Sequence, residues 1–346
     1  MSTAPTPSPQ PLGLSAADEL LLRGALARGI ASQAALADWK RARGFRYYDE
    51  IDFPATLLLP RIHAHLLRAK LADPWSPQLA KLTRYHWLHN TETLRHFVPL
   101  LDKLQQAGCR PLLVGGAALL AGAWLDDLQD RPRLDPQLLI PPAEAGVARR
   151  VFDALGWHAA RLAPVAGWRN EFWRGSDGGS VLVRYDWLPR KFPFVGHAEV
   201  AAGGTTGELS GRAVLVPSAT DLMEQCCVLA SQRRPAAGYR LVQLVDAWRV
   251  LSRTPNGIDW DRLLEQAREH GSLQSVRESL HYFARNFSAP IPADWLRKID
   301  QLAAPRRSLL AGHGPWRTYF RAEQAANRQP RGMRALRYAF WRVTRR

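Results

Sequence analysis

The sequence is poor in cysteine and has no long apolar run. Its three cysteines, Cys109 and the neighbours Cys226 and Cys227, form neither a CxxC pair nor an even-numbered set, which excludes a disulfide framework. We therefore expect them to be small, buried apolar side chains in a reducing compartment. No run of 18 or more apolar residues is present, and the N-terminus lacks the pattern of a secretion signal. These absences predict a soluble, cytoplasmic protein without a transmembrane segment.

Acidic residues are scarce compared with basic ones. The formal net charge is +16, and residues 305–346 contain eleven arginines against the single acid Glu323. Such a basic tail suits contact with nucleic acid or another anionic surface, but charge alone does not choose among these partners. A solvated tail without any partner has the same composition.

The periodicity of apolar residues changes twice along the chain. Residues 1–14 are rich in Pro, Ser and Thr and predict a disordered leader. Spacings of three and four residues predict a helical N-terminal region over 15–108, which opens at a capping Ser15. Short apolar runs around glycine turns predict a small mixed-sheet core over 109–217, and helical spacing returns over 218–304 before the Arg-rich tail, 305–346. The fold class expected is therefore α+β.

One short segment has the pattern of a nucleotide-binding unit. The apolar run that ends at Val114 is followed by Gly115 and Gly116 and then by a helix-like segment, and a second strand-like run follows Asp135. Glycines let a backbone approach phosphates closely, and the N-terminus of the following helix presents amide donors to an anion. A pair of glycines after a strand is also typical of a plain tight turn. Asp135 before Pro136 has a plain alternative as well, because Asp often caps a turn.

The surrounding motifs resemble a bacterial nucleotidyltransferase family whose pattern reads Leu-Lys-Gly, a helix, then Arg-Pro and Asp-x-Asp-Leu-Leu-Val. The matching segments are Leu113-Val114-Gly115, Ala118-Leu119, Arg131-Pro132 and Asp135-Pro136-Gln137-Leu138-Leu139-Ile140. Further matches are Val183-Arg184-Tyr185-Asp186-Trp187, Leu241 to Leu251 with Asp246, and Asp259-Trp260. The resemblance implies a nucleotidyltransferase-like core, an NTP and Mg²⁺ as cofactors, and a nucleotide site that includes Gly115, Gly116 and Arg131.

The carboxylates that hold the metals in such a family are incomplete in this chain. Two acids at i and i+2 of one strand share a face and bind Mg²⁺, and a third acid on a neighbouring strand completes the site. On the alignment, Asp135 keeps the first catalytic position, Gln137 stands at the second and Arg184 at the third. Val114 and Leu229 replace the family's Lys and His. We expect Asp135 and Gln137 to project from one face of a strand, with Arg184 beside Asp135.

The sequence thus predicts a nucleotidyltransferase-family protein with a degenerate metal site, which binds a nucleotide or another phosphorylated ligand or acts as an accessory protein. The first alternative is an active Mg²⁺-dependent enzyme, in which Asp135 binds the metal together with Asp130 or Asp186 as substitute ligands. The second is a nucleic-acid-binding accessory protein that uses residues 305–346.

Overall fold

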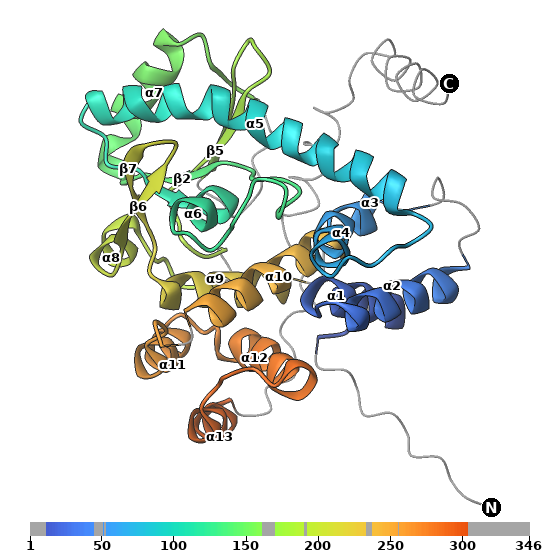
Figure 1. The fold of residues 1–346 in the computed structure, drawn as a ribbon. Helices are drawn as coiled ribbons and strands as arrows, with labels where there is room; N and C mark the ends of the chain where they lie inside the picture. The colour runs from blue at the N-terminus through green and yellow to red at the C-terminus, as the bar shows by residue number, and fades with distance from the viewer. Residues whose placement is uncertain are drawn as a thin grey trace, which may run out of the picture.

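The computed structural model describes residues 12–44, 51, 53–160, 170–189, 192–232, 237–254 and 256–303. The predicted basic tail and most of the predicted leader lie outside these residues. Helices come first along the chain, a seven-stranded sheet follows, and helices return at the end (Figure 1). The α+β class predicted from the sequence is therefore confirmed. None of the described helices is both long and apolar enough to cross a membrane.

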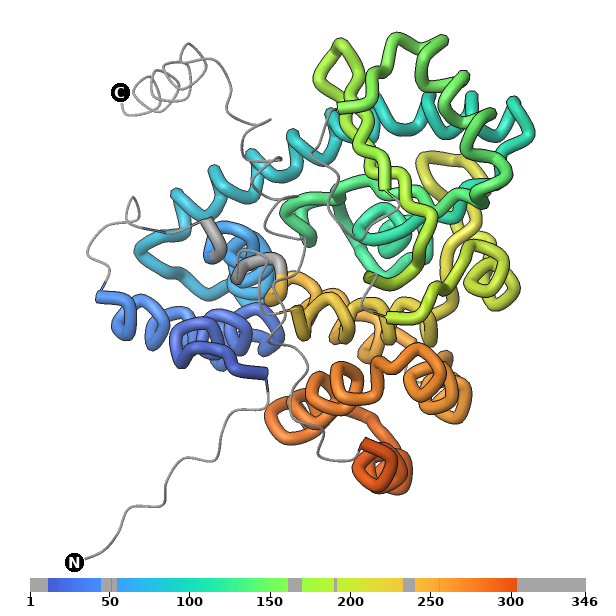
Figure 2. The backbone as a smooth tube through the Cα atoms, turned by 180° about the vertical axis from the view of Figure 1, so that it is seen from behind, coloured from blue at the N-terminus to red at the C-terminus, as the bar shows by residue number. Residues whose placement is uncertain are grey.

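The N-terminal helices are α1 (Ala16–Leu26), α2 (Ile30–Arg43), α3 (Phe53–Thr56), α4 (Leu59–Arg68) and α5 (Ser76–Gln106). The hydroxyl of Ser15 accepts a hydrogen bond from the backbone N–H of Asp18 at 3.0 Å, so the predicted N-cap is present. Helix α5 spans 31 residues and buries one long face that mixes apolar and polar side chains. It runs across the upper part of the molecule, with α7 next to one of its ends (Figures 1 and 2).

All the described strands lie between residues 112 and 216, where the periodicity predicted a sheet. They are β1 (Leu112–Val114), β2 (Gln137–Leu139), β3 (His158–Ala159), β4 (Asn170–Arg174), β5 (Ser180–Arg184), β6 (Thr205–Leu209) and β7 (Arg212–Val216). Their spatial order is β3-β4-β5-β2-β1-β7-β6. Strand β2 pairs antiparallel with β1 and parallel with β5, so the sheet is mixed. Between the strands lie α6 (Gly115–Ala121), η2 (Pro142–Glu144), α7 (Ala145–Ala154) and α8 (His197–Ala202).

The C-terminal helices pack under the sheet, on the side away from α5 (Figure 2). They are α9 (Ala219–Ala230), α10 (Ala237–Arg253), α11 (Trp260–Glu269), α12 (Leu273–Phe287) and α13 (Ala293–Leu302). Helix α9 is buried on almost every side, and its polar side chains, among them Asp221 and Glu224, are buried together with its apolar ones.

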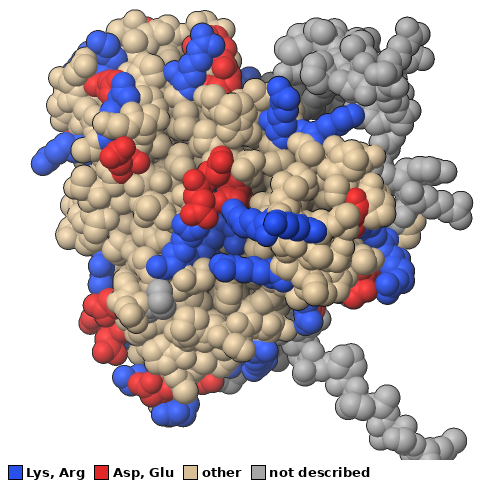
Figure 3. Space-filling model, viewed as in Figure 1, with Lys and Arg blue, Asp and Glu red and all other residues tan. Residues whose placement is uncertain are grey.

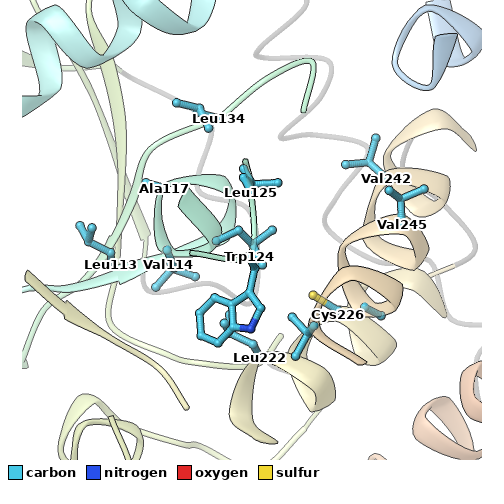
Figure 4. Close-up of a cluster of buried hydrophobic side chains, with 14 of the residues drawn as sticks. Leu113, Val114, Ala117, Trp124, Leu125, Leu134, Leu222, Cys226, Val242 and Val245 are labelled. Atoms are coloured by element: carbon cyan, nitrogen blue, oxygen red, sulfur yellow. The ribbon is translucent and has the colours of Figure 1, made fainter. Parts of the chain in front are cut away.

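A single apolar core joins these regions. Figure 4 shows Val114 of β1 and Ala117 of α6 facing Leu222 and Cys226 of α9 across a layer of apolar side chains. All three cysteines are free and buried, as predicted. Burial raises the pKa of the Cys227 thiol to about 12, so this thiol stays protonated and unreactive at neutral pH.

His270 joins α8 to α9 inside this lower layer. Its Nδ1 lies 3.0 Å from both carboxylate oxygens of the fully buried Glu224, and its Nε2 lies 2.9 Å from Glu199. Burial lowers the pKa of His270, but the two glutamates outweigh burial and raise it to about 9. The imidazole is therefore charged in the folded protein at neutral pH.

We expect this ion pair to make stability depend on pH. Because the folded pKa exceeds the unfolded value of about 6.5, the stabilisation is complete below about pH 6.5 and is lost as pH rises toward 9. The free energy of unfolding should fall by on the order of 1 to 2 kcal/mol over this range, since the half-exposed Glu199 is screened by solvent. Denaturant unfolding from pH 6 to 10 measures this loss, with His270→Gln as the control that should lack it. If the free energy of unfolding changed equally with pH in the parent and in His270→Gln, the pH dependence would not come from His270.

Candidate functional site

The first strand of the sheet leads into a glycine pair at the N-terminus of α6. Gly115 has a φ of +65°, a left-handed conformation that disfavours any side chain. A Cβ on Gly115 would lie 3.4 Å from the side-chain nitrogen of Gln137, so Gly115 lies directly beside β2. Gly116 is in closer contact, because a Cβ there would lie 2.4 Å from the carbonyl oxygen of Leu134. The nearest neighbour of Gly116 is therefore the protein's own backbone.

Asp135 does not lie on the strand as predicted. Strand β2 begins at Gln137, and Asp135 precedes it with a φ of +43°. This conformation fits the turn alternative for an Asp before Pro136. The Oδ1 of Asp135 lies 3.1 Å from Nε of Arg133, so its partner differs from the predicted Arg184. The side chains of Arg133 and Asp135 are 22% and 26% exposed, which makes them accessible charges at this edge of the sheet.

Arg184 and Gln137 meet across the pair of parallel strands. Arg184 pairs in register with Leu139, and side chains at i and i+2 share a face, so Arg184 and Gln137 lie on the same side of the sheet. The Nη1 of Arg184 donates to Oε1 of Gln137 at 3.3 Å, and its Nη2 donates to the carbonyl of Trp187 at 2.6 Å. Arg184 is only 2% exposed. The second and third carboxylate positions of the family pattern thus hold an amide and a guanidinium in contact with each other.

Arg131 is held in a buried ion pair that the sequence did not predict. Its Nε donates to Oδ2 of Asp246 at 2.9 Å, and the other carboxylate oxygen accepts from Nη1 of Arg249 at 3.0 Å. Burial lowers the pKa of Arg131, but the carboxylates of Asp246 and Asp135 raise it by more, so the guanidinium stays charged. Two motifs that lie 115 residues apart, Arg-Pro and the Leu-x-x-Leu-x-Asp-Leu helix, therefore bind each other. A contact between Arg131 and a nucleotide stays a prediction.

Asn90 fixes the loop that carries Arg131. This fully buried residue of α5 donates from Nδ2 to the carbonyls of Leu128 and Arg131 at 2.7 and 2.6 Å, and its Oδ1 accepts from the backbone N–H of Leu134 at 3.1 Å. The side-chain amide of Asn90 thus forms hydrogen bonds with backbone groups of an irregular buried loop, which have no partners in a helix or strand. The sequence signal for this role is a polar residue on the otherwise apolar face of a long helix.

The two proposed substitute ligands are both buried. The carboxylate of Asp130 lies 3.4 Å from Nη2 of Arg68, and Asp186 is 5% exposed. Among the described residues, no group of three or more His, Cys, Asp or Glu side chains is arranged to hold a metal ion. With Asp135 paired to Arg133, and Arg184 at the third position, these residues do not fit a divalent metal, because the nearby guanidinium groups would repel it.

Comparison with known proteins agrees with the motif pattern. A model of the family described as "Uncharacterised nucleotidyltransferase" matches residues 55–288, more than half of the chain. A solved structure of the antibiotic-resistance factor ANT(2'')-Ia aligns with a TM-score of 0.34 and 15% identity, over 48% of this chain and 94% of that one. No curated protein sequence matches significantly. The chain belongs to the family described as uncharacterised nucleotidyltransferases.

Proposed function

We propose that this nucleotidyltransferase-family protein binds a nucleotide or another phosphorylated ligand without metal-dependent nucleotidyl transfer. The observation that carries the proposal is the hydrogen bond between Arg184 and Gln137. A guanidinium stays protonated at any physiological pH, so this position keeps a fixed positive charge where the family pattern has a carboxylate.

The charges at this edge of the sheet favour an anion. The partly exposed Arg133 lies against Asp135 at this edge of the sheet, and Arg184 contacts Gln137, whose side chain lies next to Gly115. Arginine side chains and backbone N–H groups bind phosphate oxygens without a metal.

Isothermal titration with ATP, in the presence of Mg²⁺ and in the presence of EDTA, tests the proposal. We expect ATP to bind with a dissociation constant that EDTA changes by no more than about threefold, under 1 kcal/mol. No pyrophosphate should be released from the NTP. Binding that requires Mg²⁺, or release of pyrophosphate, would support the active-enzyme alternative, in which Asp130 or Asp186 joins Asp135 as a metal ligand.

The double variant Gln137→Asp with Arg184→Asp should gain Mg²⁺ affinity that the parent lacks. Both new carboxylates lie on one face of β2 and β5, which is the arrangement that two metal-bridging acids need. Titration calorimetry with Mg²⁺ measures the gain, and circular dichroism checks that the variant folds.

The single variant Gln137→Asp is the matched control. Its new carboxylate lies within reach of Arg184, so the two should pair and leave no net negative charge for a cation. Equal Mg²⁺ affinity in the single variant and the parent is therefore expected. A folded double variant that binds no Mg²⁺ would show that the alignment of these positions is wrong.

A further inference from the structure

The start of α2 and the end of α4 meet in an exposed corner of the molecule. A Cβ on Gly29 would lie 3.9 Å from the Cβ of Ala69, so the two helix ends are in contact. We call residues 28–30 and 67–70 the basic corner. These residues include no acidic side chain and three cationic ones, Arg28, Arg68 and Lys70.

Two aliphatic side chains of the basic corner face solvent. Ile30 and Leu67 are 75% and 61% exposed, the largest fractions of any large apolar side chain that the structure describes. Residues 67–70 are all exposed, so the corner projects from the surface and does not form a groove. Because burial of aliphatic surface is favourable, Ile30 and Leu67 favour contact with an apolar phase.

The backbone at the end of α4 is strained at one of the cationic residues. Lys70 follows the C-cap residue Ala69 and has a φ of +55°, a conformation in which glycine is the usual residue at a helix end. Its backbone N–H donates to the carbonyl of Leu67 at 3.0 Å, which keeps these two residues close. A lysine is less favourable here than a glycine, but it adds a charge to the corner. Strained positions of this kind cluster at functional sites.

The charges of the basic corner are incompletely compensated. In the part of the chain that the structure describes, no carboxylate pairs with Arg28 or Lys70. Arg68 is 58% exposed and lies 3.4 Å from the buried carboxylate of Asp130. The acid that follows the corner along the chain, Asp73, is bound by Lys40 at 2.7 Å. The corner therefore attracts an anionic partner.

A neighbouring histidine is exposed to the same positive field. Burial, and then the charges of Arg61, Arg68 and Arg28, lower the pKa of His65 in α4 to about 3. Arg28 and Arg68 are thus close enough to act on one imidazole, so their charges reinforce each other. Figure 3 shows basic side chains gathered in the middle of one face of the molecule, beside a smaller acidic group.

We infer that the basic corner docks on an anionic lipid bilayer. Ile30 and Leu67 enter the interface, and the three cationic side chains contact the anionic headgroups. Interfacial membrane contacts combine apolar burial with electrostatic attraction in this way. The corner has no aromatic ring on which a base could stack, and its projecting shape provides no groove for a peptide. This surface is separate from residues 305–346 and does not rest on the ligand proposed for the sheet edge.

Cosedimentation of the full chain with lipid vesicles tests the inference. We expect the parent to bind vesicles of equal parts phosphatidylcholine and phosphatidylserine, and not vesicles of phosphatidylcholine alone. The double variant Arg28→Gln with Lys70→Gln should bind at least about tenfold more weakly, or 1.4 kcal/mol, because each basic residue near an anionic membrane adds to binding. The matched control is Arg41→Gln with Lys298→Gln, which removes the same charge from side chains that are 77% and 52% exposed elsewhere. The control should bind as the parent does.

A fluorescent label reports whether the apolar side chains enter the bilayer. An environment-sensitive dye on Leu67→Cys should shift its emission to the blue on the phosphatidylserine vesicles, because the dye moves into a less polar phase. The natural cysteines are buried, so the dye reacts with the new one. Leu155→Cys, at an exposed position at the end of α7, is the control that should show no shift.

Three results would overturn the inference. Equal vesicle binding by the parent and by Arg28→Gln with Lys70→Gln would show that another surface makes the contact. The absence of a blue shift at position 67, in protein that is bound to the vesicles, would show that the corner does not enter the interface. Binding of a single-stranded oligonucleotide or of polyglutamate without binding of the vesicles would show that the partner is a different polyanion. Because the changed side chains are exposed, each variant should fold as the parent does, which circular dichroism checks.

Discussion

Replacing Asp246 with alanine should lower the free energy of unfolding by about 3 to 5 kcal/mol, the range observed when one partner of a buried ion pair is removed. The carboxylate is 1% exposed and accepts from Arg131 at 2.9 Å and from Arg249 at 3.0 Å. Both guanidinium groups would stay in the interior without this acceptor. Chemical denaturation at neutral pH, with the midpoint and the slope fitted separately, measures the loss.

Asp38→Ala provides the control for this prediction. Asp38 pairs with Arg41 at 3.0 Å, a similar distance, but the two side chains are 48% and 77% exposed. Solvent screens such a pair, so the control should lose no more than about 1 kcal/mol. If Asp246→Ala were as stable as Asp38→Ala, the buried pair between the two family motifs would not stabilise the fold.

The sequence predicted where the sheet begins and ends because periodicity is a local signal. Helical spacing stops before Leu112 and resumes after Val216, and the described strands fill that interval. The β6–β7 hairpin inside the interval was not predicted. Its two-residue turn, Ser210-Gly211, has positive φ at both positions, as a type I′ turn requires, and the Ser-Gly dipeptide was an available signal. Strand β6 was difficult to predict because its sequence, Thr-Thr-Gly-Glu-Leu, has a single apolar side chain and so no apolar alternation.

The site was predictable only in part because its contacts join distant segments. The alignment predicted that Gln137 and Arg184 would share a face, and the strand register shows that they do. It placed Asp135 on the strand, but Asp135 precedes Pro136 and lies in a turn before the strand, where it forms a local ion pair with Arg133. The polar Asn90 on an apolar helix face signals a buried hydrogen-bonding role, but nothing in the sequence of α5 reveals which loop its amide binds.

The glycine pair shows how one residue type can serve two purposes. Gly115 needs its glycine for a positive φ, whereas Gly116 needs it for close packing. The carbonyl of Leu134 and the guanidinium of Arg131 both lie where a side chain at Gly116 would begin. Gly116 thus brings α6 against the loop that Asn90 and Asp246 hold from the other side.

Gly116→Ala should therefore destabilise the fold by about 3 kcal/mol or more, because the new methyl group overpacks a rigid region. Its Cβ would lie 2.4 Å from the Leu134 carbonyl oxygen and 2.5 Å from Nη1 of Arg131. Backbone cannot move aside as a flexible side chain can, and displacing Arg131 would disturb its pair with Asp246. Denaturant unfolding of the variant measures the loss.

Gly146→Ala is the matched control for this change and should shift stability in the opposite direction. Gly146 lies in α7, where a Cβ would meet no atom closer than 3.9 Å, at Nη1 of Arg150. Alanine favours a helix over glycine by about 0.5 to 1 kcal/mol, so this variant should be slightly more stable than the parent. If Gly116→Ala lowers the free energy of unfolding while Gly146→Ala raises it, the loss at Gly116 comes from the close contact of the new methyl group with Leu134 and Arg131. It does not come from replacing glycine by alanine as such. A Gly116→Ala protein as stable as the parent would mean that Leu134 and Arg131 can move away from α6, and that this glycine is kept for an approach to a ligand instead.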